Sequence, residues 1–485
     1  MKNKTNCLLY AEYNRKSVVH NILFLVVALM MVVSLFFVRD VPRETFEYNE
    51  KNAVWQSQYV KIFDAFKKGQ LHLDIKPSDE LLALENPYDT AARDAAGVFY
   101  HWDHALYNGK YYSYFGIAPL LTTYIPVYLI TGELPNDALV TLILGIYSVI
   151  FMALAYREIV LRFAKKANLW LFLLGFCALT AVSGVYYTVF IGDVYNVQVA
   201  SALGCSMAFV FYALRAMRKD NIFIRCILLA LAAVSLGLTV MSRPTAALMC
   251  VCIFPVFFEF LLASKKEQWR KTLITVGSFA VPLLICASVV MWYNAARFSS
   301  PFDFGEKYQL TVNDISKNTF EFNFIFSSIV SYFFYPFLIS PNPLRWYMGG
   351  GQLVPYGSRY VYGEAYVGAF ALVLPALILL YPRLARADER EGTRDFTKNA
   401  FAFCVAALSL IVGYVDFCKG GTHIRYVYDI IPMLSLAGLV TGLGLCAHAK
   451  GKKRILAILL CALAFIVAIY FGNVLVEHYR FSFQN

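Results

Sequence analysis

Long apolar runs separated by short polar connections form the dominant pattern of this chain. The run from 18 to 38 matches the ~20 residues that cross the hydrocarbon core of a bilayer as a helix. Later runs predict further spans near 137–156, 168–188, 199–214, 224–242, 245–263, 272–293, 362–381, 399–415, 429–447 and 455–474. The pattern therefore predicts an all-α polytopic membrane protein with about eleven transmembrane helices.

Two other apolar runs are interrupted, and we do not expect them to cross the membrane. Pro119 and Pro126 interrupt the run at 115–133, and polar residues and prolines break the run at 323–340. Proline removes a backbone donor and disturbs a helix interior. We expect 115–133 to dip into the membrane interface and to return to the same side.

Basic residues indicate the orientation of the spans. More than half of the 43 basic residues fall in six clusters: Lys2/Lys4/Arg15/Lys16, Arg157/Arg162/Lys165/Lys166, Arg215/Arg218/Lys219/Arg225, Lys265/Lys266/Arg270/Lys271, Arg383/Arg386/Arg390/Arg394/Lys398 and Lys450/Lys452/Lys453/Arg454. With eleven spans, all six clusters fall on one side, which the positive-inside rule assigns to the cytoplasm. We expect a multi-pass bacterial plasma-membrane protein with its N-terminus in the cytoplasm and its long loops outside.

This orientation divides the chain into seven parts. They are a cytoplasmic N-terminus (1–17), a first uncleaved span (18–38), a large extracytoplasmic loop (39–135), spans two to seven (136–293), a second extracytoplasmic loop (294–361), spans eight to eleven (362–474) and an extracytoplasmic C-terminus (475–485).

The first outer loop is too long to be a simple connector, so we expect it to carry structure of its own. Tyr59, Ile62, Phe63 and Phe66 recur at helical spacing before Gly69. This spacing predicts an amphipathic helix lying on the membrane surface. A second short helix is expected at 78–85.

Composition and motifs exclude several classes of protein. The chain is 59% hydrophobic and 15% charged, against roughly 25% charged in soluble domains. Its net charge of +11 lies in the six basic clusters, so it indicates membrane topology and not a nucleic-acid partner. No phosphate-binding GxxxxGK[ST] loop, HExxH helix or paired CxxC appears. We expect no cofactor and no tightly bound metal.

The densest polar and aromatic segment is 97–116, GVFYHWDHALYNGKYYSYFG. Its Asn-Gly dipeptide at 108–109 lies between two aromatic-rich runs and predicts a β-hairpin. Strand alternation would put two pairs on opposite faces: His101 with Asp103, and Trp102 with His104. The segment combines a carboxylate, imidazoles and aromatic rings, and the simpler interpretation is an interfacial aromatic belt.

Charged residues also gather at the outer ends of spans, namely Asp193, Arg243, Arg297, Arg425 and Asp429. Charged groups at membrane depth are costly and tend to mark functional sites. For Arg243 the alternative is a side chain that snorkels to the interface. Arginine and lysine grouped on the outer face can neutralise a phosphate carried by a lipid.

Three motifs resemble those of the GT-C superfamily of integral-membrane glycosyltransferases, in particular its bacterial dolichyl-phosphate-mannose-protein mannosyltransferase-like group. The first is the amphipathic helix Tyr59-x-x-Ile62-Phe63-x-x-Phe66-x-x-Gly69 after the first span. The second is Gly109-Lys110-Tyr111-Tyr112 leading into Gly116-x-x-Pro119. The third comprises Tyr293-Asn294-x-x-Arg297-Phe298-x-x-Pro301 and the late Arg425-Tyr426. The resemblance covers most of 18–445.

The resemblance implies an enzyme that moves a sugar from a polyprenyl-phosphate donor to an acceptor hydroxyl at the outer face, with inversion and a carboxylate base. Members of the group usually carry an acidic residue just before the tyrosine of the amphipathic helix. This chain has Gln56-Ser57-Gln58 there. We therefore expect the base elsewhere: Asp103 first, then Asp40 directly after the first span, then Asp193.

The other expected site residues bind substrate. Arg297, Arg425, Arg243 or Lys110 would stabilise the leaving phosphate. Aromatic rings would stack on sugars, and polar groups complete the set: Trp102, Tyr107, Tyr111, Tyr112, His101, His104 and Asp429. The expected partners are a polyprenyl-phosphate-linked sugar, a glycan, lipid or protein acceptor, and the bilayer.

Two other functions fit the same composition. A transporter or flippase for lipid-linked saccharides would carry polar residues within its spans and an internal repeat. The chain has few intramembrane charges and no convincing repeat, which favours an enzyme. A non-catalytic scaffold for envelope assembly is the second alternative, because the acid before Tyr59 is missing.

Overall fold

The computed structural model describes residues 15–38, 57–263, 269–333, 354–356, 359–361 and 392–484. In this part of the chain, ten helical segments are long and apolar enough to cross a membrane: α1 (Arg15–Val38), α6 (Asp137–Phe163), α7 with α8 (Leu169–Val182, Val185–Ile191), α9 (Val194–Met217), α10 (Ile222–Ser242), α11 with α12 (Pro244–Met249, Phe254–Ala263), α13 (Trp269–Phe298), α16 (Gly392–Gly420), α17 (Ile424–His448) and α18 (Gly451–Gln484). They correspond to ten of the expected spans, and the span expected at 362–381 lies outside the described residues. The chain is therefore an all-α polytopic membrane protein.

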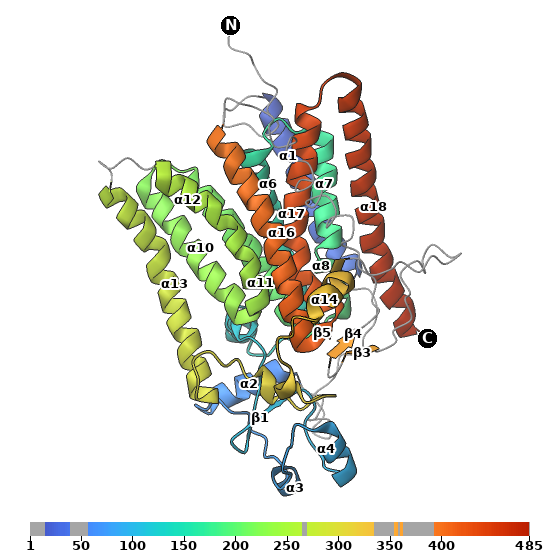
Figure 1. The fold of residues 1–485 in the computed structure, drawn as a ribbon. Helices are drawn as coiled ribbons and strands as arrows, with labels where there is room; N and C mark the ends of the chain where they lie inside the picture. Colours follow the sequence, from blue (N-terminus) through green and yellow to red (C-terminus); the bar gives the residue numbers. More distant parts are fainter. Residues whose placement is uncertain are drawn as a thin grey trace.

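Helices α9 and α17 form the centre of the bundle. In each of these two helices, 89% of the residues in an apolar stretch of 18 are buried inside the protein, against 11% in α1 and 6% in α13. Helices α6 and α10 pack on either side of α9, and α13 lies at the edge against α10 (Figure 1). Leu284 and Trp292 of α13 are more than half exposed. Such an apolar outer face is stable only against lipid.

The basic ends of the helices gather at one end of the bundle, opposite the folded loops (Figure 1). Glu158 of α6 is 1% exposed and accepts hydrogen bonds from Arg215 at 3.0 Å and Arg218 at 2.5 Å. Arg162 pairs with Glu259 of α12 at 2.8 Å. The helix directions thus bring together the charged ends that the sequence pattern assigns to the cytoplasm.

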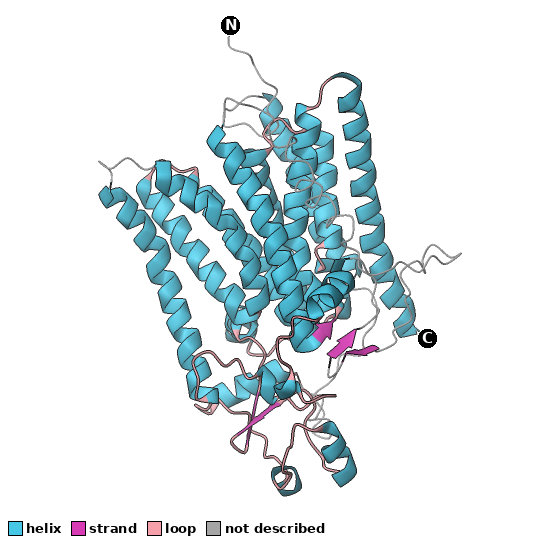
Figure 2. Ribbon diagram, in the orientation of Figure 1, coloured by secondary structure: helices cyan, strands magenta, loops and turns pink. Residues whose placement is uncertain are grey.

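The first loop folds against the other end of the bundle, shown in Figures 1 and 2. It carries α2 (Gln58–Lys67), α3 (Asp79–Leu82), α4 (Thr90–Ala96), the strands β1 (Ala105–Tyr107) and β2 (Lys110–Tyr112), the π-helix η2 (Leu120–Tyr124) and α5 (Ile125–Thr131). The amphipathic helix and the short helix are thus present as expected. We expected the apolar face of α2 to lie on the membrane surface, but this face packs on protein. The Tyr59 ring stacks on the Tyr124 ring, with centroids 5.0 Å apart.

The apolar run at 115–133 forms η2 and α5, which together are too short to cross a bilayer. Leu129 and Ile130 are 76% and 84% exposed. At the start of the run, Gly116 lies against the end of α10, where an added Cβ would approach the Met241 carbonyl oxygen to 2.1 Å. The segment therefore connects the first loop to the bundle without adding a span.

The predicted hairpin is present but short. Antiparallel β1 and β2 pair Tyr107 with Lys110, and the turn residues Asn108 and Gly109 have φ of 48° and 70°, as a type I′ turn requires. Strand alternation does not extend to residue 101, because Asp103 has a φ of 56°. The expected face assignment is therefore wrong: the His101 and His104 rings lie together, with centroids 5.5 Å apart.

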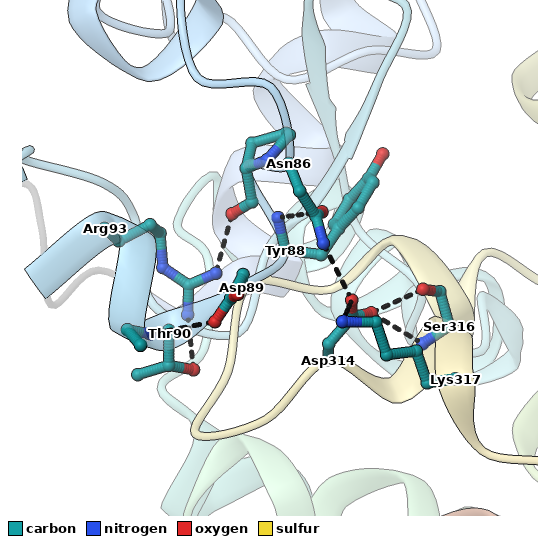
Figure 3. Close-up of polar contacts among 10 residues, drawn as sticks. Asn86, Tyr88, Asp89, Thr90, Arg93, Asp314, Ser316 and Lys317 are labelled. Carbon is teal, nitrogen blue, oxygen red and sulfur yellow. Dashed lines mark hydrogen bonds and ion pairs between the residues drawn. The ribbon is translucent and has the colours of Figure 1, made fainter.

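A second loop, which includes η5 (Glu306–Tyr308) and η6 (Ile315–Lys317), folds onto the first. Figure 3 shows the contact: Asn86 of the first loop donates a hydrogen bond to Asp314 of the second loop at 3.0 Å. Within the first loop, Arg93 of α4 donates to the Pro87 carbonyl at 2.7 Å. The fully buried Arg93 also donates to the Thr311 carbonyl at 2.5 Å. Beyond this loop lie α14 (Phe324–Phe333) and a small sheet of β3 (Val354–Tyr356), β4 (Arg359–Val361) and β5 (Gly421–Thr422).

Candidate active site

A cavity of about 520 Å³ lies where the two loops meet the end of the bundle. Its wall comes from six parts of the chain, namely the first loop (Trp102, Asp103, 114–117), α9 (Tyr195, Gln198), the α10–α11 junction (240–245), the end of α13 (290, 293–294, 297), the second loop (304, 306, 309, 311–313, 315) and the α16–α17 junction (415–416, 419–420, 423, 425–426). The volume falls in the range of small-molecule sites. The cavity combines apolar surface near the spans with converging charged groups.

Asp103 is the carboxylate that the first loop brings to this cavity. Its main chain is fixed on both sides: its N–H donates to the Leu310 carbonyl at 2.9 Å, and its carbonyl accepts from Gln58 at 2.6 Å. Its Oδ2 accepts a hydrogen bond from the Tyr195 hydroxyl. Burial raises the pKa of Asp103 above its ordinary value, and the Tyr195 hydrogen bond and the charge of Arg425 oppose that rise.

Arg425 is the cation whose charge acts on the Asp103 carboxylate. Its guanidinium lies over the Tyr195 ring, 4.3 Å from the centroid, so one tyrosine contacts both charged groups. Its Nε donates to Nδ1 of His423 at 3.3 Å. Within the described part of the chain its two terminal nitrogens form no hydrogen bond, so they are open to an anion in the cavity.

Arg243 lines the cavity but is largely neutralised. Its Nε and Nη2 donate to the two carboxylate oxygens of Asp429, each at 2.7 Å. Thr245 donates to the same carboxylate at 2.6 Å. Asp429 therefore holds Arg243, and the alternative interpretation of a side chain that snorkels to the interface does not apply, because Arg243 is buried in a bidentate pair.

Arg297 also reaches the cavity from the end of α13. It is 4% exposed and donates to the Ser113 carbonyl at 2.6 Å and to Asn294 at 3.1 Å. The guanidinium carbon lies 3.7 Å from the centroid of the Tyr293 ring. With these contacts Arg297 ties α13 to the segment after the hairpin.

The two histidines of the dense segment lie behind the cavity wall. His104 Nδ1 lies 2.7 Å from the Trp102 carbonyl, so it carries the proton, and Nε2 accepts from Lys61 at 3.1 Å. Burial lowers the pKa of Lys61 to about 8 and that of His104 to about 3. Neither His101 nor His104 lines the cavity, and both stabilise the segment that carries Trp102 and Asp103.

The other expected site residues lie outside the cavity lining. Tyr111 and Tyr112 pack inside the loop layer, and Lys110 is exposed at the hairpin. Asp193 caps α9, accepting from the Asn196 main chain at 2.9 Å. Asp40 lies outside the described residues. Of the aromatic residues expected to bind sugar, Trp102 lines the cavity and is 43% exposed.

The position where related enzymes carry an acid has a structural use in this chain. Ser57 caps α2 through the Tyr59 main chain, and it donates to Asp137 at 2.8 Å. Gln58 donates to the Asp103 carbonyl and accepts from Ser113 at 2.7 Å. An amide can do both at once, whereas an ionised carboxylate can only accept. The side chain of Gln58 therefore fixes the main chain of Asp103 against Ser113.

Sequence reasoning missed most of the other residues that line the cavity, among them Tyr195, Glu306 and Asp416. Tyr195 belongs to a polar segment that the sequence marks, but its contact with Asp103 joins residues 92 positions apart. Asp416 directly follows an apolar run, which was the available signal. Among the described residues no group of three or more His, Cys, Asp and Glu side chains has the arrangement of a metal site.

No family model matches the chain, and no curated protein matches it. Three solved structures resemble it over nearly its whole length. ArnT from Cupriavidus metallidurans, bound to undecaprenyl phosphate, is 13% identical with a TM-score of 0.43, covering 94% of this chain and 77% of that one. Two structures of the Archaeoglobus fulgidus oligosaccharyltransferase are 12–13% identical: the apo form has a TM-score of 0.46, and the AglB complex with an inhibitory peptide and a dolichol-phosphate has 0.47.

These neighbours are GT-C glycosyltransferases, the superfamily that the sequence resembles. The matches to the oligosaccharyltransferase structures include 93–95% of this chain but only 56% of the length of those chains. Identities of 12–13% and TM-scores below 0.5 are too low to assign an activity or a substrate to this chain. The bacterial mannosyltransferase-like subgroup stays a prediction.

Proposed function

We propose that this protein is a membrane glycosyltransferase that uses a polyprenyl-phosphate-linked sugar. The single observation that carries the proposal is the Asp103–Tyr195–Arg425 arrangement. A buried carboxylate and an open guanidinium contact the same tyrosine, at a cavity beside apolar spans. A base and an anion-binding cation beside one cavity are the two groups that transfer from a phosphate ester requires.

In the proposed reaction the lipid tail lies against the spans and the phosphate faces Arg425. Asp103 accepts the proton of an acceptor hydroxyl as its oxygen attacks the anomeric carbon. The bond from that carbon to the phosphate oxygen breaks, and the phosphate leaves with the electron pair and with inversion at carbon. Arg425 stabilises the charge that develops on the phosphate. The acceptor is a glycan, lipid or protein hydroxyl.

Loss of Asp103 should abolish transfer while leaving the fold intact. Purified protein in nanodiscs is given a radiolabelled polyprenyl-phosphate hexose, and release of polyprenyl phosphate is followed. Asp103→Asn should lower the rate about 10²–10⁴-fold, the range of general-base catalysis. Asp94→Asn, an exposed carboxylate on α4 of the same loop, is the matched control and should keep full activity.

Two outcomes would contradict the proposal. If wild type and Asp103→Asn release phosphate equally while Asp40→Asn is inactive, the base is Asp40. If wild type releases no phosphate from any polyprenyl-phosphate sugar, the protein is not this enzyme.

A further inference from the structure

Asp416, in the last turn of α16, is a buried acid that the proposed mechanism does not use. It lines the cavity and is 8% exposed. Its Oδ2 is fully buried and accepts no hydrogen bond in the part of the chain that the structure describes. A buried carboxylate oxygen without a donor costs free energy, so proteins seldom retain one without a use.

The neighbouring cations do not satisfy this acid. Arg243 uses Nε and Nη2 on Asp429. Lys419, one turn further along α16, donates to the Asn318 carbonyl at 3.2 Å and lies over the Phe320 ring. The charged groups that act on Asp416 are Asp429, Arg243 and Glu306. Two of these three are acidic, and the third, Arg243, is paired with Asp429.

Asp416 belongs to a different part of the cavity from Asp103. The charged and hydrogen-bonding groups that act on Asp103 are Tyr195, Arg425 and Thr311, and none of them acts on Asp416. The cavity thus has Arg425 beside Asp103, and elsewhere the acids Asp416 and Glu306 together with the engaged cations Arg243 and Lys419. A ligand with a phosphate at one end and donor groups at the other fits this division.

Building on the proposed function, we propose that Asp416 binds the acceptor substrate by taking a hydrogen bond from one of its donor groups, a hydroxyl or an ammonium. The phosphate of the donor substrate lies at Arg425, away from this acid. The acceptor therefore belongs to the class of polyhydroxylated or amino-substituted molecules, and Asp416 is a binding residue that touches it.

The test combines stability with kinetics. Asp416→Leu and Asp416→Asn should leave the thermal midpoint of the purified protein unchanged or higher, because each removes a carboxylate without a partner. Asp429→Asn is the comparison, because it breaks a satisfied buried pair and should lower the midpoint. A fall in the midpoint of both Asp416 variants would show a structural role and overturn the proposal.

The kinetic arm uses octyl glucoside and octyl glucosaminide as probe acceptors. Asp416→Asn should raise the KM of the acceptor at least tenfold, and this rise should exceed any change in kcat. A larger rise with the amino sugar identifies an ammonium as the donor group, and an equal rise identifies a hydroxyl. An unchanged acceptor KM would overturn the proposal.

A failure of the proposed function is distinguishable from a failure of this inference. If the wild type neither transfers nor hydrolyses the sugar, the two probe glycosides are tested by thermal shift in the absence of a donor. Stabilisation of wild type that Asp416→Asn loses supports the acceptor site. Equal stabilisation of both proteins, or of neither, overturns it.

Discussion

Tyr195 is the residue on which the chemistry of the site depends most directly after Asp103 itself. Its hydroxyl donates to Asp103 and its ring lies under Arg425. The hydrogen bond lowers the pKa of Asp103, in opposition to burial. A tyrosine that contacts both groups therefore favours the ionised form of Asp103 and packs against the guanidinium of Arg425.

Tyr195→Phe should move the acidic limb of the pH–rate profile to higher pH. The base acts when ionised, so activity falls as the pH drops through its pKa. Removing the hydroxyl removes a contribution that lowers this pKa, and the ring under Arg425 is kept. The measurement is kcat/KM for polyprenyl-phosphate release between pH 4 and 9. A limb that stays in place, or moves to lower pH, would contradict the assignment of Asp103 as base.

Lys61 should impose a pH dependence on stability. Burial lowers its pKa from 10.5 to about 8, so folding favours its neutral form. The cost of burying the charge is present below pH 8 and is relieved as pH rises from 8 to 10.5, because the unfolded state then binds more protons.

Lys61→Met removes this titration and leaves His104 Nε2 without its donor at every pH. The stability of wild type minus variant should therefore rise by roughly 1–3 kcal/mol between pH 7.5 and 10. Thermal midpoints in matched detergent buffers measure it. Parallel pH curves for the two proteins would show that Lys61 is not held with a lowered pKa.

At the scale of elements, the contact between the first loop and α10 depends on Gly116. A Cβ there would lie 2.1 Å and 2.5 Å from the carbonyl oxygens of Met241 and Ser242. Gly116→Ala should lower stability by about 1–3 kcal/mol, since these backbone atoms must move. Activity should fall as well, because the displaced segment lines the cavity. Scanning fluorimetry and the transfer assay measure the two effects.

Gly277→Ala on α13 is the matched control. Nothing lies within 4 Å of its added Cβ, and its helical backbone suits alanine. This variant should be neutral or more stable by about 0.5–1 kcal/mol. If both variants behave alike, the close approach of 115–133 to α10 is not a constraint on the fold.

How far elements are predictable from the sequence depends on how local their causes are. Apolar runs specify spans because each span must bury its own backbone hydrogen bonds in lipid. The hairpin turn follows from Asn108 and Gly109, which tolerate positive φ. The same reasoning failed at Asp103, whose positive φ is set by contacts with Leu310 and Gln58. Tyr111 and Tyr112 were expected to bind sugar, but both are buried in the loop layer: Tyr111 packs in the cluster of Tyr59 and Leu106, and Tyr112 packs against Phe298 at the end of α13.

At the scale of the whole molecule, the described basic clusters and the cavity lie at opposite ends of the helix bundle. The basic clusters in the described part of the chain lie at the end of the bundle opposite the folded loops (Figure 1). The basic residues that line the cavity, Arg243, Arg297, Lys419 and Arg425, belong to none of these clusters. If the basic end faces the cytoplasm, the cavity faces outward, where a lipid-linked sugar with its tail in the outer leaflet can enter from the side of the spans.

The orientation is testable with reporters fused after residues 135 and 160, at the two ends of α6. Alkaline phosphatase should be active at 135 and inactive at 160, and a cytoplasmic fluorescent reporter should show the reverse. The reason is that 115–133 is too short to cross and that Arg157 and Arg162 hold the far end of α6 on the positive side. Phosphatase activity at 160 would place the basic end outside and the cavity in the cytoplasm. A cytoplasmic cavity would require the donor phosphate to enter from the inner leaflet, so this one measurement decides from which leaflet the substrate is drawn.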